Sequence, residues 1–351
     1  MSQIMCRILP MLFYRPFSIP KKARSVYYEH VPEGVVTLGR LEQRRYFVLL
    51  KTVDMNTHTK QTWLLEYRSN VTSSHGEDGI IAKIFETMGT DSKWCVELGA
   101  LNGIHDSNVW NLIKNKEWSG VLIEADPTYF DKLVAQYTDR PTAHCIKDFV
   151  SFEGESSLDA IFGRTPMPLL FDVLSLDIDG NEYHIWESLV RYSPRLLVVE
   201  FNPSIPNDVL FVQSRDMNVY QGSSLSAFIA LGKKKGYELV CANETNAFFV
   251  RTEDFHHFNI SDNSIDAIRT DHQFETKLFQ LYDGTLMIAG NNRLLWHNRV
   301  IDMRKLQVLP VHRRQYPARI SPEPFIRGLK YVIRKMPFYP LVQRVRKLLG
   351  I

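Results

Sequence analysis

The sequence lacks a hydrophobic run long enough to cross a membrane. A spanning helix needs about 20 apolar residues, whereas the best candidate, residues 8–14, is short and contains Pro10. The four cysteines form no C-x-x-C pair, which argues against a structural zinc site and favours a reducing compartment. The sequence also shows no clear secretory signal, internal repeat or low-complexity tract. These absences predict a soluble, cytoplasmic protein.

Two common phosphate-binding motifs are missing as well. The chain contains neither a G-x-G-x-x-G loop nor a G-x-x-x-x-G-K-[ST] loop, so NAD-dependent and ATP-dependent chemistry lose support. The chain has 351 residues, of which 44% are hydrophobic and 23% charged. That length and composition predict a folded domain with a sizeable core.

Charge is distributed unevenly along the chain. The formal net charge is +3, but residues 301–351 hold twelve lysines and arginines against two acids. Apolar and basic residues there recur at helical spacing, which predicts two short basic amphipathic helices. Such a tail would contact an anionic membrane peripherally, with nucleic acid as the less favoured partner. The alternative is that the tail packs on the body with a solvated basic face. The basic residues of 1–28 indicate a solvated arm or a transit peptide.

Short β-rich segments alternate with amphipathic stretches from about residue 75 onward. This alternation predicts a largely parallel sheet covered by helices. A pair of runs at 237–242 and 247–250, separated by turn-forming residues, predicts an antiparallel hairpin at the sheet edge. The other predicted strands cover residues 94–98, 120–124, 143–146, 172–177 and 196–200.

Apolar residues between these strands recur at the spacing of a helix face. Five such helices would cover both faces of the sheet, which is an α/β fold. We divide the chain into an N-terminal extension (1–70), a central domain (71–250) and a C-terminal extension (251–351). The predicted helical faces lie around residues 80–88, 109–113, 130–137, 185–190 and 225–231.

A glycine loop follows the first predicted strand. Glu97, Gly99 and Gly103 form the pattern E-x-G-x-x-x-G, and Asp106 or Ser107 would cap the next helix. Glycines at this point let the backbone approach a bulky ligand, and in doubly wound sheets ligands bind at the carboxyl ends of the strands. The loop therefore predicts a ligand site at this edge of the sheet.

A second signal comes from the ends of the next two strands. Glu124 ends the second strand, 21 residues after Gly103, where an acid would accept hydrogen bonds from both ribose hydroxyls of a nucleoside. Asp148, just past the third strand, would meet an adenine amino group or serve as an ordinary turn residue. The combination predicts a nucleoside-containing cofactor, and the alternative is a turn glycine beside a surface glutamate.

Acidic residues gather after the fourth and fifth predicted strands. Asp177 and Asp179 would point to the same side if the strand continued through both, and Glu200 and Asn202 would join them. Like charges held together either bind a divalent cation such as Mg²⁺ or keep a proton. His184, one turn into the next helix, is a candidate general base. The alternative is that these acids hold a helix N-terminus and backbone amides, with His184 structural.

At these residues the sequence resembles the FkbM-type class of S-adenosylmethionine-dependent methyltransferases. The resemblance covers about residues 73–250, and the extension from 251 onward lies outside it. The matching stretches are residues 73–79, 96–100, 121–127, 175–182 and 198–200.

The resemblance implies a Rossmann-like class I methyltransferase fold with a mostly parallel seven-stranded sheet. It implies S-adenosylmethionine as methyl donor and a hydroxyl acceptor on a sugar, glycan or other small metabolite. Glu97, Gly99 and Gly103 would face the methionine end of the cofactor and Glu124 its ribose, while residues 177–180 would border cofactor and acceptor. Where the family commonly has Asp-x-Glu-Gly, this chain carries the shorter Asp179.

In-line methyl transfer needs orientation of the acceptor hydroxyl and a group that takes its proton. We predict Asp179 or His184 as that base, with Asp177, Glu200 and Asn202 as ligands of the acceptor or of a cation. In the connection 201–222, Tyr220 and Phe211 are candidates to stack on the acceptor or to cover the core.

Two other functions remain open from the sequence. A metal-dependent glycosyltransferase would use Asp177-Ile178-Asp179 as a D-x-D motif, but it leaves the glycine loop and Glu124 without a role. A non-catalytic binding protein on a methyltransferase scaffold is the second alternative, because a fold does not fix a function.

Overall fold

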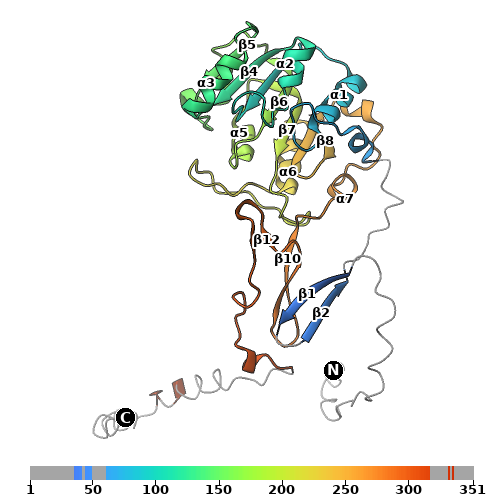
Figure 1. Ribbon diagram of the computed structural model, residues 1–351, viewed down its shortest axis with the longest axis vertical. Helices are drawn as coiled ribbons and strands as arrows, with labels where there is room; N and C mark the ends of the chain where they lie inside the picture. Colours follow the sequence, from blue (N-terminus) through green and yellow to red (C-terminus); the bar gives the residue numbers. More distant parts are fainter. Residues whose placement is uncertain (1–34, 42–43, 50–60, 317–330, 333, 336–351) are drawn as a thin grey trace, which may run out of the picture. The chain divides into compact units, whose positions relative to one another are not determined.

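The computed structural model describes residues 35–41, 44–49, 61–316, 331–332 and 334–335 (Figure 1). The chain divides into two compact units, residues 1–54 and 55–351. In the first unit the described residues form an antiparallel hairpin of β1 (Val35–Leu41) and β2 (Arg44–Leu49). Among all described residues, none belongs to a helix that is long and apolar enough to span a bilayer.

The second unit is built on a seven-stranded sheet with the order β5-β4-β3-β6-β7-β9-β8. The first five strands are parallel, β9 runs antiparallel to β7, and β8 runs antiparallel to β9. The predicted Rossmann-like α/β fold with a mostly parallel seven-stranded sheet is therefore confirmed. The strands are β3 (Trp94–Leu98), β4 (Ser119–Glu124), β5 (Ala143–Lys147), β6 (Leu170–Leu176), β7 (Ser193–Glu200), β8 (Tyr237–Ala242) and β9 (Asn246–Arg251).

The chain order creates a switch point in the middle of the sheet. The chain starts at β3, moves outward through β4 to β5, and then returns to the other side of β3 as β6. Loops at the carboxyl ends of β3 and β6 therefore diverge from one another, and such a crevice is where open α/β sheets bind ligands.

Burial explains why these segments form central strands. In β3, β4, β6 and β7 nearly every residue is buried, irrespective of the side on which it projects. Continuous burial of this kind requires cover on both faces. The helices are α1 (Glu77–Met88), α2 (Trp110–Lys116), α3 (Pro127–Gln136), α4 (Leu158–Phe162), α5 (Glu182–Ser188), α6 (Leu225–Lys235) and α7 (Ile265–Ile268).

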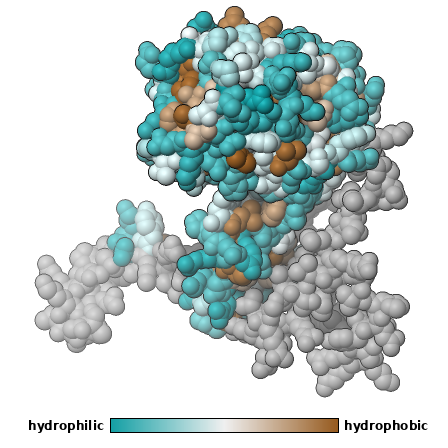
Figure 2. Space-filling view, turned by 45° about the horizontal axis from the view of Figure 1, so that its top comes forward, coloured by the Kyte–Doolittle hydropathy of each residue, from teal (hydrophilic) through white to brown (hydrophobic). Residues whose placement is uncertain are grey.

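The predicted helix faces supply most of this cover, although Val134 in α3 is 41% exposed. Ile80, Ile84 and Trp186 are fully buried in the core. Helix α5, however, ends at Ser188, and Val190 beyond it is 80% exposed. On the face shown in Figure 2, hydrophobic residues occur in small separate groups on the described surface.

Segments outside the predicted central domain also pack on this sheet. Leu64, in the short helix η2 (Trp63–Tyr67), is fully buried. Arg195 of β7 is buried and pairs with Asp254 at 2.8 Å and Asp172 at 3.4 Å, which attaches the chain after β9 to the sheet. The domain boundaries at 70 and 250 stay a prediction.

Small hairpins that the sequence did not predict follow the sheet. They pair β10 (Thr276–Gln280) with β11 (Leu286–Gly290), and β12 (Arg293–Leu294) with β13 (Arg299–Val300). Residues 331–332 and 334–335 are helical, but the rest of the predicted basic helices and the arm 1–28 lie outside the described residues. The remaining short helices are η3 (Gly154–Ser156), η4 (Phe255–Phe258), η5 (Leu295–His297) and η6 (Val311–Arg313).

Candidate functional site

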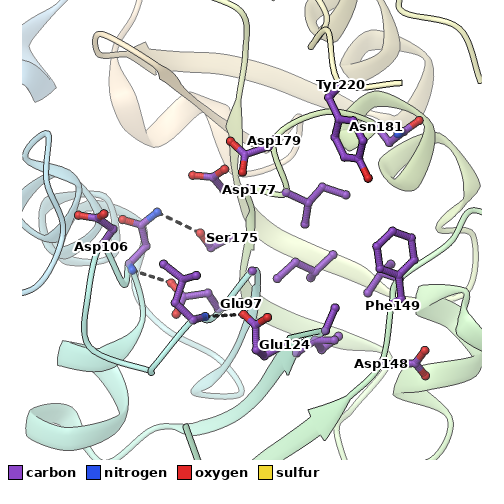
Figure 3. A pocket seen from close by; sticks show the side chains of 18 of the residues that line it. Glu97, Asp106, Glu124, Asp148, Phe149, Ser175, Asp177, Asp179, Asn181 and Tyr220 are labelled. Atoms are coloured by element: carbon purple, nitrogen blue, oxygen red, sulfur yellow. Dashed lines mark hydrogen bonds between the residues drawn. The ribbon is translucent and has the colours of Figure 1, made fainter. Parts of the chain in front are cut away.

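A cavity of about 390 Å³ lies at the carboxyl ends of β3, β4, β5 and β6. This volume falls in the range of small-molecule sites. Figure 3 shows Asp177, Asp179 and Tyr220 in the upper part of the view and Glu124 and Asp148 in the lower part. The predicted glycine loop, Glu124 and the acids after β6 therefore meet around one cavity.

The two glycines of the loop have different neighbours. Gly99 has φ +70°, and a Cβ there would lie 2.2 Å from the carbonyl oxygen of Asp177. Gly103 has φ +76°, and a Cβ there would meet Leu133 and Tyr137 at 2.7 Å. Gly99 lines the cavity, whereas Gly103 is not among its lining residues and packs against α3.

Glu97 is buried at the end of β3 and lines the cavity. Its carboxylate accepts hydrogen bonds from the Ser107 hydroxyl and the Asn108 amide, each at 2.6 Å. Burial raises the pKa of Glu97 to about 7, although these hydrogen bonds act in the opposite direction. Ser107 also accepts from the Trp110 amide at 3.0 Å, although the N-cap of α2 is Val109 rather than the predicted Asp106 or Ser107.

Glu124 is buried at the end of β4, and backbone amides fix both of its oxygens. Oε2 accepts from the Leu101 amide at 2.8 Å and Oε1 from the Asp126 amide at 2.7 Å. A carboxylate has about four acceptor positions, so each oxygen keeps one for a ligand in the cavity. The bond to Leu101 also ties Glu124 to the glycine loop.

Asp148 lines the other end of the cavity, past β5. One carboxylate oxygen accepts from the Ser156 hydroxyl at 2.7 Å and the other from Arg164 at 2.9 Å. The next residue, Phe149, is 56% exposed and also lines the cavity. Phe149 was not among the predicted site residues, although its position next to Asp148 was a usable signal.

The acids after β6 are brought together by a loop rather than by strand alternation. Strand β6 ends at Leu176, and Asp179 and Asn181 adopt positive φ values of 61° and 54°. Buried Glu182 holds this loop, accepting from the amides of Ile178 at 3.1 Å and Gly180 at 2.7 Å. The strand thus does not continue through Asp177 and Asp179, because the backbone turns at that point.

Asp177, Asp179 and Glu200 form an acid cluster in which the ligand atoms all lie within 4.8 Å of one another. Enclosure by protein raises the pKa of Glu200 to about 9, with further contributions from Asp177 and Glu182. Enclosure and then repulsion from Asp179 raise the pKa of Asp177, although its side chain is open to the cavity. At neutral pH the acid cluster therefore holds a proton, and its hard oxygen donors also suit a divalent cation.

The structure does not bring every predicted residue to the acid cluster. Asn202 lies beside Glu200, but its Oδ1 accepts from Ser204 and its Nδ2 donates to the Gln221 carbonyl at 2.8 Å. His184 is buried, with Nε2 2.9 Å from the Gln213 carbonyl oxygen, and it lines neither described cavity. Asp177 and Glu200 of the predicted ligand set therefore lie together with Asp179, and the role of Asn202 as a ligand stays a prediction.

Two acids of the first matching stretch hold the fold together. The Asp78 carboxylate accepts from the amides of residues 71–73. Buried Glu77 accepts from the side chains of Asn243 at 2.6 Å and Asn246 at 3.0 Å. The bonds of Glu77 join the start of α1 to the turn between β8 and β9. Neither acid lines the cavity.

A second cavity of about 250 Å³ shares Asp179 and Tyr220 with the first. Tyr220 thus occupies the place expected for a residue that contacts substrate, whereas Phe211 lines neither cavity. The second cavity also includes Trp296 and His297, for which the sequence offered no signal.

No family model matches the chain, and no curated protein matches it either. Several solved structures with similar folds are described as methyltransferases. The N-terminal domain of EvdMO1 with SAH bound has a TM-score of 0.34 and 11% identity, covering 51% of this chain and 82% of its own. A SAM-dependent methyltransferase from Aquifex aeolicus has a TM-score of 0.31 and 12% identity, covering 49% and 88%. The CurJ carbon methyltransferase has a TM-score of 0.36 and 10% identity, covering 54% and 57%.

Proposed function

We propose that this chain is an S-adenosylmethionine-dependent methyltransferase of the FkbM type. It would transfer a methyl group to a hydroxyl of a sugar, glycan or other small metabolite. The observation that carries the proposal is a single cavity at the switch point, with Gly99 and Glu124 on one side and Asp177 and Asp179 on the other. One side offers groups for a nucleoside and the other offers groups for a proton.

The cofactor would lie along the ends of β3, β4 and β5. Glu124 has acceptor positions left for the two ribose hydroxyls, because each oxygen receives one backbone hydrogen bond. Asp148 would accept from the adenine amino group beside the ring of Phe149. Glu97 and the exposed backbone at Gly99 would hold the methionine end, where a positively charged amino group suits a carboxylate. S-adenosylmethionine supplies the methyl group on a sulfonium centre.

The chemical step depends mainly on the orientation of the acceptor hydroxyl toward the cofactor. Asp179 lines both cavities, so its carboxylate can receive the proton of an acceptor hydroxyl that faces the cofactor. Asp177 and Glu200 share a hydrogen bond. This bond partly offsets the increase in the pKa of Asp177 and adds to the increase in the pKa of Glu200. The pair thus keeps one proton and limits the negative charge beside the reacting hydroxyl. We assign the role of general base to Asp179 rather than to His184, because His184 Nε2 is hydrogen-bonded to the Gln213 carbonyl.

The proposal also includes a Mg²⁺ ion bound at the acid cluster. Asp177, Asp179 and Glu200 would hold it in place of the shared proton, because their ligand atoms lie within 4.8 Å of one another and match the oxygen ligands that Mg²⁺ prefers. Bound there, the ion would supply positive charge next to the acceptor hydroxyl.

The basic tail supports a proposal about location. Residues 301–351 carry twelve lysines and arginines against two acids, and an anionic membrane surface attracts such a segment. We propose a cytoplasmic protein that contacts membranes peripherally through this tail.

Calorimetry with S-adenosylmethionine and S-adenosylhomocysteine tests the cofactor site. Each hydrogen bond to a charged group contributes about 1.5–3 kcal/mol, so Glu124→Ala is expected to weaken binding about 10- to 100-fold. Glu153→Ala, at an exposed glutamate outside both cavities, is the matched control and should bind like the wild type. Absence of binding to the wild type, with a nucleotide sugar and Mn²⁺ binding instead, would establish the glycosyltransferase alternative.

A further inference from the structure

The second cavity has an outer wall that comes from beyond the methyltransferase sheet. Asp179, Glu200 and Tyr220 line this cavity together with Trp296 and His297. The latter two belong to η5, which lies between β12 and β13 and more than 40 residues after β9. A segment outside the resemblance to the methyltransferase family therefore borders the acid cluster.

Buried contacts hold this C-terminal segment against the loop that follows β7. Arg269 is only 2% exposed and donates to the carbonyl oxygens of Pro203 at 2.7 Å and Ile205 at 2.9 Å. Its guanidinium also lies 5.0 Å from the ring centroid of Phe201. The Thr276 amide donates to the Ser204 carbonyl at 3.0 Å at the start of β10. The C-terminal segment is thus fixed to the loop that carries Asn202 into the second cavity.

A short hairpin presents the wall residues. Strands β12 and β13 pair Arg293 with Val300 and Leu294 with Arg299, and Arg293 closes the turn with a 2.6 Å hydrogen bond to Asn298. Trp296 is 60% exposed between these strands. Because this exposed indole also lines the cavity, its ring is available to a ligand.

The lining chemistry restricts what the second cavity can hold. The aromatic faces of Trp296 and Tyr220 favour the apolar C–H face of a ring. Carboxylates and the backbone around Asn202 accept hydrogen bonds from hydroxyl groups. In metal-free protein the acid cluster repels an anionic group, because like charges in a partly enclosed site cost several kcal/mol.

We propose that Trp296 and His297 form the wall of the acceptor subsite and that this subsite takes an uncharged, polyhydroxylated ring and rejects its anionic counterpart. Trp296 provides the stacking surface and His297 a polar group at the edge. The inference rests on the proposed function, because it assumes that the adjacent cavity holds the methyl donor.

Fluorescence quenching tests the charge around Trp296 without any cofactor. The chain has six tryptophans, and subtracting the emission of Trp296→Phe isolates residue 296. After normalisation to free N-acetyltryptophanamide, the caesium quenching constant should exceed that of iodide at least about twofold. The excess should shrink when Asp179→Asn and Glu200→Gln are introduced. Equal quenching by the two ions would overturn the charge argument.

Saturation-transfer NMR tests the acceptor class on protein loaded with S-adenosylhomocysteine. Methyl β-D-glucopyranoside is the neutral probe and the corresponding methyl glucuronide is its anionic match. We expect a signal from the neutral probe that falls at least about fivefold for the glucuronide. The signal should also be lost in Trp296→Ala, retained in part in Trp296→Phe and unchanged in Tyr282→Ala, whose ring is 89% exposed and lines neither cavity.

The two proposals fail in different ways. If the wild type does not bind S-adenosylhomocysteine, the proposed function is wrong whatever Trp296 does. Suppose instead that S-adenosylhomocysteine binds the wild type and Trp296→Ala with the same affinity. If the neutral glycoside then gives no signal, or gives equal signals with the two proteins, the acceptor subsite is wrong and the cofactor site stands.

Discussion

Gly99→Ala tests whether the close approach of two loops builds the site. An alanine at φ +70° costs about 1–2 kcal/mol in the left-handed region. Its Cβ would also lie 2.2 Å from the Asp177 carbonyl oxygen, so that backbone must shift by roughly 1 Å to reach normal contact. A displacement of this size at a catalytic group can lower turnover about 100-fold. Because Glu124 binds the Leu101 amide, cofactor affinity should fall at least about tenfold.

Gly154→Ala is the matched control for this substitution. Gly154 has φ +74° with no atom within 4 Å of an added Cβ, so it carries the backbone cost without the clash. Urea unfolding should show a loss of about 1–2 kcal/mol for Gly154→Ala and a larger loss for Gly99→Ala. Calorimetry with S-adenosylmethionine should show reduced affinity for Gly99→Ala alone. Equal unfolding free energies and equal affinities for the two variants would refute the reasoning.

Four further predictions follow from the acids and the tail. Asp179→Asn should lower kcat about 100- to 10,000-fold, as expected for loss of a general base, with cofactor affinity within about twofold; unchanged turnover on the true acceptor would contradict the assignment. Burial raises the pKa of Glu182 to about 8, so the folded state binds more protons than the unfolded state between pH 4.5 and 8, and the free energy of unfolding falls as pH rises. In urea titrations, Glu182→Gln should make that fall shallower by up to about 1 kcal/mol per pH unit. Identical pH slopes for the variant and the wild type would disprove it. Mg²⁺ should raise the Tm of the wild type and not that of an Asp177→Asn, Glu200→Gln double variant, and equal shifts would remove the metal proposal. Anionic liposomes should pellet the full chain more than a chain of residues 1–320, and equal pelleting would count against membrane contact.

Local sequence features predicted the sheet well because burial acts on short segments. Residues 94–98 and 237–242 form strands with the predicted limits, since runs of apolar and β-branched residues must be covered on both faces. Helix α5 ended earlier than predicted, because the apolar Val190 satisfied the helical spacing although the fold leaves it exposed. Periodicity reports which residues are apolar, and only packing decides which of them are covered.

The candidate site was predicted only in part for a related reason. The sequence identified Glu124 and the acids after β6 by their position at strand ends. It could not separate Gly99 from Gly103, which have similar φ values but face different elements. Nor could it show that Ser204 engages the oxygen of Asn202 or that Gln213 engages His184. These outcomes depend on contacts with residues elsewhere in the fold.

By itself the sequence determined the α/β architecture, the edge hairpin and the strand ends at which polar residues gather, because these follow from local hydrophobic patterns and turn residues. The tertiary structure alone decided that Asp177, Asp179 and Glu200 converge and that Trp296 and His297 border the same cavity as Glu200. Residues almost 100 positions apart meet there because parallel strands end at one edge and Arg269 fixes the C-terminal segment against it. No local pattern in the sequence predicts such a long-range contact.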